Sequence, residues 1–237
     1  AGTINFNVPV DGMANVFTAG SDSAYDGILP TALGFTAGVG NVFTFPAVTG
    51  LVSFGGLPLF VSADGFDGGQ DTTDILSSDD PVDPADNYPG ISGIIYGHGD
   101  AVFPDYVTYP GLGYEPGKTM FLTGVFLGDN LPDVTPDRLD FTNDADFESL
   151  SPELGQTFFI GDGRRLDGST LQQFVAPAGA TRLFLGFGDA LDFGYPRSEA
   201  GYYGDNHGAL HAQVQLNNAA VEDVDWYSFV LLAHETA

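Results

Sequence analysis

The chain has 237 residues, of which 32 are acidic and only six are basic, so its formal net charge is -26. Such a surface repels nucleic acid and anionic membranes, and neither is expected as a partner. The same charge opposes compaction unless cations neutralise some carboxylates, and calcium is the expected counter-ion. There is no cysteine, which excludes a disulfide framework and a thiolate site, and no apolar run is long enough to span a membrane as a helix.

Composition also indicates the fold class. The chain contains 33 glycines and 15 prolines, its aromatic content is 13%, and no long segment has the apolar period of an α-helix. These features are typical of many short strands joined by tight turns. We therefore predict a single domain over residues 1–237, an all-β, antiparallel β-sandwich of the jelly-roll type with long acidic loops rich in glycine and proline.

Near the N-terminus, Thr3 to Val10 alternates apolar and polar residues, which predicts a strand with one buried face. Its apolar positions are Ile4, Phe6 and Val8. The next strands are predicted at Asn41 to Leu51 and at Leu57 to Ser62. Pro46 lies inside the first of these two, and a proline there indicates either a sheet edge or a bulge.

Residues 63–87 differ from their surroundings, because Asp, Gly, Ser and Pro dominate them and predict a long loop excursion. Four aspartates of this loop fall close together, namely Asp64, Asp67, Asp71 and Asp74. Two interpretations remain open for them. The segment is either a solvated acidic loop or a second calcium site, and it lacks the terminal glutamate of an EF-hand loop.

The middle of the chain predicts further strands, at Ile91 to Tyr96, Thr119 to Leu127, Arg138 to Phe141, Thr157 to Ile160 and Leu171 to Val175. Asp144 to Leu154 predicts a short helix, because acidic residues occupy its first turn. His98 and Asp100 follow the first of these strands and form either a structural turn or a ligand pair.

The stretch from Thr181 to Leu216 predicts two strands joined by an acidic, glycine-rich loop. Alternation in both strands indicates one buried face and one solvated face. The buried positions are Thr181, Leu183, Leu185, Phe187, Leu210, Ala212, Val214 and Leu216. The loop carries Asp189, Asp192, Asp205 and Asn206. Because calcium binds oxygen atoms supplied by loops, these four side chains are candidate calcium ligands.

Within this stretch, Gly188-Asp189 and Gly201-Tyr202-Tyr203-Gly204-Asp205-Asn206-His207-Gly208 are similar to a known family. They resemble the PA-IL-like, calcium-dependent galactophilic lectins, which belong to the galactose-binding-like β-sandwiches. The resemblance implies that Asp189, the pair Asp205 and Asn206, and the backbone carbonyl of Tyr202 hold calcium, with sugar hydroxyls completing the coordination. The residues implied to contact the sugar are Tyr202, Tyr203 and His207. The pair is Asp-Asn here where the family has Asn-Asn, and the loop is longer.

Two other segments resemble exported proteins of environmental bacteria, of the PEP-CTERM-associated kind. They are Phe43-Thr44-Phe45 with Val48-Thr49-Gly50, and Gln156 to Gly163. The chain also starts at Ala1 rather than Met, as expected for a mature protein after removal of a signal peptide. We therefore expect a secreted, extracellular protein at the cell surface.

Residues 221–237 predict an extra C-terminal strand, because Asp225 to Leu232 is apolar on both faces. A strand of this kind must be covered on both sides. It is either a central strand of its own sandwich, or it or the N-terminal strand adds to the open edge of a neighbouring subunit. The residues expected to contribute to assembly are Ile4, Phe6, Val8, Trp226, Tyr227, Phe229, Val230 and Leu231.

Features of a catalytic site are missing from the sequence. There is no cysteine and no Gly-x-Ser-x-Gly motif, and carboxylates are too numerous for any pair of them to indicate a glycosidase. His207 and His211 have no third zinc ligand nearby in the sequence. We therefore expect a non-enzymatic, calcium-stabilised structural or adhesive protein that self-associates as a surface matrix or filament subunit. The alternative is a calcium-dependent lectin that binds extracellular glycans.

Overall fold

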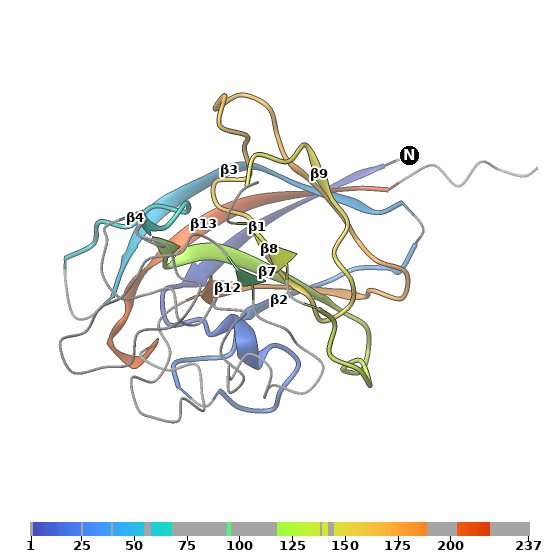
Figure 1. The fold of residues 1–237 in the computed structure, drawn as a ribbon, viewed down its shortest axis with the longest axis horizontal. Coiled ribbons are helices and arrows are strands. Elements are labelled where there is room, and N and C mark those ends of the chain that lie inside the picture. The colour runs from blue at the N-terminus through green and yellow to red at the C-terminus, as the bar shows by residue number, and fades with distance from the viewer. Residues whose placement is uncertain are drawn as a thin grey trace, which may run out of the picture.

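Figure 1 shows the computed structural model of the chain, in which strands dominate. The structure describes residues 2–24, 26–38, 40–54, 58–67, 94–95, 118–137, 139–141, 145–188 and 203–218. Within these ranges the helical segments are the short 3-10 turns η1 (Val16–Thr18) and η4 (Tyr203–Asp205). The predicted all-β class is therefore confirmed for the described part of the chain.

The larger sheet has five strands in the order β1-β13-β3-β11-β9. Their bounds are β1 (Thr3–Asp11), β13 (His207–Asn217), β3 (Val42–Ser53), β11 (Gln173–Val175) and β9 (Ser149–Leu150). All neighbours are antiparallel except β9 and β11, which run parallel. The first and last long strands of the described chain therefore lie side by side in this sheet.

The second sheet has four antiparallel strands in the order β10-β7-β12-β2. Their bounds are β10 (Thr157–Phe159), β7 (Phe121–Leu127), β12 (Arg182–Gly188) and β2 (Thr31–Gly34). Two short pairs complete the strands, β4 (Phe66–Asp67) with β6 (Lys118–Thr119) and β5 (Ile94–Ile95) with β8 (Leu139–Asp140).

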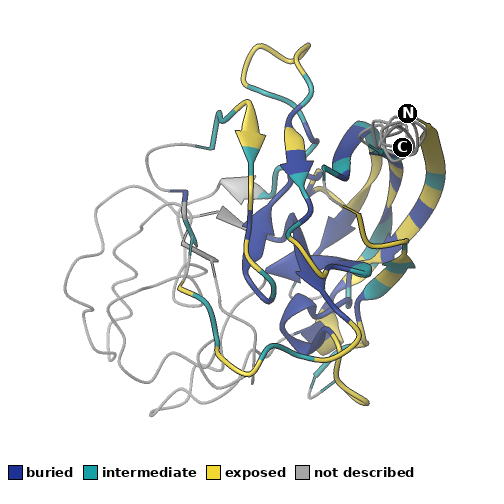
Figure 2. Ribbon diagram, turned by 90° about the vertical axis from the view of Figure 1, so that its right-hand side faces the viewer, coloured by how far each residue is buried: buried dark blue, intermediate teal, exposed yellow. Residues whose placement is uncertain are grey.

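Phenylalanine rings from the two sheets meet between them and form the centre of the core. Phe43 of β3 packs against Phe126 of β7, with ring centroids 5.4 Å apart. Phe174 of β11 stacks on Phe158 of β10 at 5.3 Å. All four rings are fully buried, and each such side chain stabilises the fold by about 1.5–3 kcal/mol. Figure 2 shows the buried residues gathered along the strands of both sheets, and the described part is therefore a β-sandwich.

The strand β13 has the alternation that its sequence predicts. Its inward residues are Leu210, Ala212, Val214 and Leu216, all of them buried. His211 and Gln213 on the opposite face are exposed. Of the two alternatives for Pro46, a sheet edge or a bulge, the structure shows the bulge. The register between β13 and β3 shifts between Gln213 and Gln215, and β3 has neighbours on both sides.

The prediction for β12 is wrong for one of its two faces. Leu183, Leu185 and Phe187 are buried as predicted, but Phe184 on the supposedly solvated face is also only 7% exposed. Gly186 lies on that face too, and a Cβ there would be 2.7 Å from the carbonyl oxygen of Ala14. The segment that leads into η1 therefore packs against Gly186 on this face and bonds to the backbone of β12 at Phe187.

The predicted helix at Asp144 to Leu154 is wrong over its described residues, 145–154, which contain β9 and a turn. Long-range hydrogen bonds hold this segment extended. The side-chain amide of Gln172 donates to the carbonyl oxygens of Ala145 at 2.8 Å and of Phe147 at 3.1 Å. Pairing with β11 therefore outweighs the local preference of the acidic residues for a helix start.

Candidate functional site

The predicted calcium site lies at the end of the sandwich where β12 ends and β13 begins, which we call the β12–β13 rim. Its described residues are Gly12, Met120, Gly188 and Tyr203 to His207. Of the predicted calcium ligands, Asp205 and Asn206 belong to it. The other three, Asp189, Asp192 and Tyr202, lie outside the described residues.

Asn206 and Asp205 have different surroundings although they are adjacent in the sequence. Asn206 is only 3% exposed, and its Nδ2 donates to the carbonyl oxygen of Gly12 at 3.2 Å. The same nitrogen lies 3.4 Å from the Sδ of Met120. Asp205 is exposed. The amide of Asn206 therefore ties the start of β13 to the turn after β1, whereas Asp205 is an exposed residue.

Met120 gives the rim an unusual backbone. Its φ of 56° makes it the one non-glycine residue with positive φ among the described residues. Such a conformation costs about 1–3 kcal/mol and persists where neighbours hold it in place. The N–H of Met120 donates to the carbonyl oxygen of Gly188 at 2.8 Å, and its side chain is fully buried. The last residue of β12 and Asn206 thus both contact this strained position.

The residues predicted to contact a sugar are divided between the core and the surface. Tyr203 is fully buried, and its hydroxyl donates to the carbonyl oxygen of Phe187 at 2.9 Å. His207 is exposed at the start of β13. Tyr202 lies outside the described residues. The ring of Tyr203 is therefore part of the core in this structure. Of the two described residues predicted to contact a sugar, His207 is the one that a ligand can reach.

The second predicted calcium site is described in part. Asp64 accepts a hydrogen bond from the N–H of Asp162 at 2.8 Å, and Asp162 was not among the predicted residues. Asp67 lies in β4, whereas Asp71 and Asp74 lie outside the described residues. Burial, and then the charge of Asp64, raise the pKa of the Asp162 carboxyl. The two aspartates therefore lie side by side, joined by a hydrogen bond from the Asp162 N–H.

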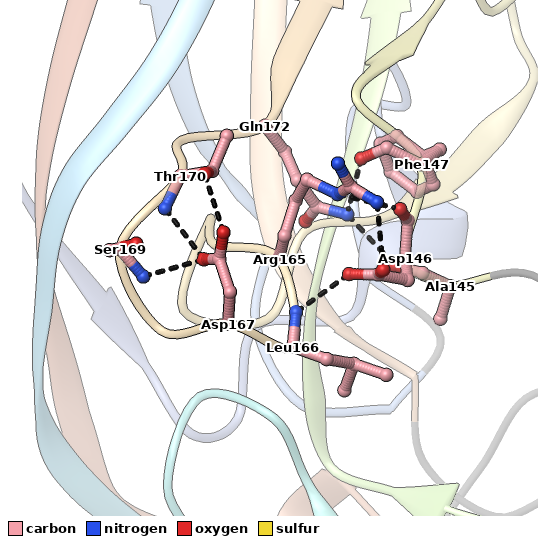
Figure 3. A network of polar contacts seen from close by, with 9 residues as sticks. All are labelled: Ala145, Asp146, Phe147, Arg165, Leu166, Asp167, Ser169, Thr170 and Gln172. Carbon is pink, nitrogen blue, oxygen red and sulfur yellow. Dashed lines mark hydrogen bonds and ion pairs between the residues drawn. The ribbon is translucent and has the colours of Figure 1, made fainter.

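A polar network fixes the protruding loop between β10 and β11, as Figure 3 shows. The guanidinium of Arg165 pairs with the carboxylate of Asp146 at 2.9 Å, and the N–H of Leu166 donates to the same carboxylate at 2.6 Å. Asp167 accepts the hydroxyl of Thr170 at 2.6 Å. These bonds lower the pKa of both carboxyls, with the Leu166 N–H the main cause for Asp146. The network stiffens the loop and leaves Leu166 90% exposed at its tip.

The free side of β1 is the other notable feature, because β1 is the first strand of its sheet. Bonds just beyond its two ends show which residues face β13: Asn218 N–H donates to Gly2, and Gly12 N–H donates to Gly208. Since the register is unbroken between them, even-numbered residues bond to β13. The N–H and C=O groups of Thr3, Asn5 and Asn7 therefore point away from β13.

This free edge has a defined end. Pro9 has no N–H, and its carbonyl oxygen accepts the hydroxyl of Thr31 in β2 at 3.1 Å. In the described chain no other strand pairs with β1 on this side. Ile4 is 47% exposed and Phe6 is half-buried, although both point toward the interior face of the sheet. The open edge, defined as Thr3 to Asn7, thus combines two features, namely backbone groups that pair with no described strand and the exposed side chain of Ile4.

The open edge adjoins an uncharged surface. Residues 2–10, 42–54 and 206–218, which contain nearly all of β1, β3 and β13, include no Asp, Glu, Lys or Arg. On the outer face of these strands, Asn7, Thr49, His211 and Gln213 line a shallow hollow of about 260 Å³. In a chain with a net charge of -26, these three ranges contribute no charged side chain of their own, and Arg164 reaches the carbonyl oxygen of Pro46 in β3 from another segment.

No family model, no curated protein and no solved structure matches this chain. Among the described residues, no group of three or more His, Asp or Glu side chains is arranged to hold a metal ion. Those residues also contain no helix that is long and apolar enough to cross a membrane. The calcium and sugar sites therefore stay predictions, and the geometry of the open edge is the main guide to function.

Proposed function

We propose that the chain is an extracellular, non-enzymatic structural or adhesive protein that self-associates through the open edge of β1. One observation supports this proposal. The backbone groups of β1 that point away from β13 lie beside the exposed side chain of Ile4, and residues 2–10 carry no charge. In this proposal, the assembled protein forms a surface matrix or filament, and calcium stabilises the β12–β13 rim through Asp189, Asp192, Asp205, Asn206 and the carbonyl of Tyr202. The proposal also includes the jelly-roll order of the strands in the sandwich.

Edge strands of folded proteins normally carry features that prevent pairing with another chain. Charged side chains, prolines, bulges or short length serve this purpose. Between Thr3 and Asn7 the strand has none of them, and its register with β13 is regular over all nine residues of β1. Pro9 interrupts the edge only beyond that point. An unprotected edge of this kind is suited to accept a partner strand.

The charge of the chain restricts where self-association is feasible. Two copies with a formal charge of -26 each repel one another wherever carboxylates meet. Contact across β1 brings uncharged residues together and covers exposed Ile4. The structural function is favoured over the lectin alternative for this reason, and also because the ring of Tyr203 is buried.

The experiment compares the wild type with Asn5→Pro by sedimentation velocity over a wide concentration range. Because the N–H of Asn5 points away from β13, proline there removes an edge donor without removing a bond of the sheet. We expect concentration-dependent association of the wild type, its loss in Asn5→Pro, and its retention in the control Asn5→Thr, which keeps the N–H. A wild type that stays monomeric at all concentrations would refute the proposal.

A further inference from the structure

The open edge has a self-complementary sequence. Thr3-Ile4-Asn5-Phe6-Asn7 reads polar, apolar, polar, apolar, polar in both directions, with Asn5 at the centre. Resting on the self-association proposed above, we infer that the partner strand is β1 of a second copy. The two strands run antiparallel around a two-fold axis at Asn5, so that the five-stranded sheets of both copies become one continuous sheet.

The direction of the backbone groups selects this register. With Asn5 opposite Asn5 of the second copy, Thr3 lies opposite Asn7 of the second copy, and all outward-pointing groups of these residues find partners. A shift by one residue would place the outward-pointing groups opposite even-numbered residues, whose N–H and C=O groups already bond to β13. A shift by two residues in one direction places Thr3 against Pro9, which has no N–H. In the other direction it pairs Asn5 with Thr3 and leaves Asn7 opposite no residue of the open edge.

The side chains of the two strands also match in this register. On the inner face, Ile4 of each copy lies opposite Phe6 of the other, so the apolar residue that is 47% exposed in one copy gains an apolar neighbour. On the outer face, the amides of Asn5 meet each other and Thr3 meets Asn7, which are uncharged hydrogen-bonding pairs. Gly2 of the second copy lies opposite Val8, next to Pro9, whose carbonyl oxygen already accepts the hydroxyl of Thr31.

The lack of charge on the edge favours a second copy as the occupant. The edge and the outer face beside it are uncharged, so they offer no attraction to a basic partner. A two-fold arrangement instead buries the neutral strand of one copy against the same strand of the other, which is the self-complementarity that an isologous interface requires. Residues 221–237 of a neighbouring copy are the competing occupant, and the experiment separates the two.

The test uses single cysteines, because the wild type contains none. Cα atoms of a hydrogen-bonded antiparallel pair lie about 5.5 Å apart, within the range of a disulfide. Under mild oxidation, we expect Asn5→Cys to form a covalent dimer in high yield. Thr3→Cys and Asn7→Cys are expected to cross-link when mixed and not when alone. The matched control is Gln213→Cys, which is equally exposed on the same face but lies on β13.

The outcomes distinguish this inference from the function on which it rests. If association persists and Asn5→Pro abolishes it, but Asn5→Cys does not cross-link to itself, the two-fold register is overturned and self-association stands. A cross-link in the double variant Asn5→Cys with Tyr227→Cys, in place of the Asn5→Cys dimer, also overturns it and assigns the edge to residues 221–237. A monomeric wild type overturns both proposals.

Discussion

At the scale of single residues, Asp162 shows how the fold sets the chemistry of a side chain. It lies in the turn after β10, where the carboxylate of Asp64 is close and burial opposes ionisation. Its Oδ1 accepts the N–H of Arg164 at 2.8 Å, which favours the ionised form but is the smaller effect. The raised pKa means that the folded chain holds this proton more tightly than the unfolded chain.

This leads to a pH-dependent prediction for Asp162→Asn. Ionisation of Asp162 lowers stability above its raised pKa, and the penalty disappears as the pH falls toward the ordinary value of 3.8. Asparagine keeps the acceptor for Arg164 and has no charge. We expect the variant to melt at a higher temperature than the wild type at neutral pH, with the difference shrinking in acid. Thermal melts over a pH series measure this.

Asp146→Asn is the control of opposite sign. The N–H of Leu166 and the guanidinium of Arg165 lower the pKa of Asp146, so its ionised form stabilises the fold above the ordinary pKa and this contribution is lost as the pH falls. The control is expected to melt at a lower temperature than the wild type at neutral pH. If Asp162→Asn also lowers the melting temperature there, the physical account of Asp162 is wrong.

At the scale of secondary-structure elements, β12 and β1 differ in how they are covered. β12 has buried residues on both faces, and Ala14 and Val16 pack closely against Gly186 on its second face. Among the strands that the structure describes, β1 has a neighbour on one side and ends the sheet on the other. A strand at the centre of the fold supports the core, whereas a strand at an open edge is available for assembly.

The close contact of Gly186 in β12 with Ala14 and Val16 predicts that Gly186→Ala destabilises the fold. The added Cβ would lie 2.7 Å from the carbonyl oxygen of Ala14 and 3.0 Å from the nitrogen of Val16, both of which are backbone atoms. We expect a loss of about 1–3 kcal/mol, which is typical of overpacking a core. Urea unfolding measures the change.

Gly34→Ala is the matched control for this prediction. Gly34 is the last residue of the neighbouring strand β2, and a Cβ there would meet nothing within 4 Å. The control is expected to change the free energy of unfolding by less than about 0.5 kcal/mol. Equal losses in both variants would show that a methyl group on the sheet, rather than contact with Ala14, is responsible.

At the scale of the whole molecule, charge and assembly are connected. The formal charge of -26 opposes both compaction and association. Residues 2–10, 42–54 and 206–218, which contain nearly all of β1, β3 and β13, nevertheless include no charged residue. Removing carboxylates from one part of the molecule concentrates them elsewhere. The proposed calcium ions would act on the acidic loops, while the neutral strands would carry the contact between copies.

Calcium removal tests the charged part of this proposal. A metal present at about a hundred times its dissociation constant stabilises a protein by about 2.7 kcal/mol. For a chain of this size, that corresponds to about 5–10 °C in melting temperature. We expect a calcium chelator to lower the melting temperature by this amount and calcium to restore it. Asp205→Asn should reduce the effect of calcium if Asp205 is a ligand.

Magnesium and sodium chloride at equal ionic strength are the controls for calcium removal. If they restore the melting temperature as well as calcium does, the effect is general screening of carboxylates rather than a specific site. A melting temperature that does not change with the chelator would contradict the calcium proposal. The proposed self-association through β1 would be unaffected by that result.

Several features of the fold could be predicted from local patterns. Alternating residues predicted the buried face of β13. Pro46 indicated either a sheet edge or a bulge, and the structure shows the bulge. These features are local, because side chains on a strand point to alternate faces and proline lacks an N–H. Glycine content and aromatic content likewise indicated the all-β class. Of the predicted calcium ligands, the rim contains Asp205 and Asn206.

Other features depend on residues far apart in the sequence and were decided by tertiary packing. Asp64 lies beside Asp162, 98 positions away, so no local spacing could connect them. Burial of Tyr203, the second covered face of β12 and the extended segment at Ser149 likewise follow from long-range contacts. By itself, the sequence determined an acidic β protein with alternating strands. Only the tertiary structure decided that β1 lies at an open edge, because the order of strands in a sheet depends on which distant segments pair.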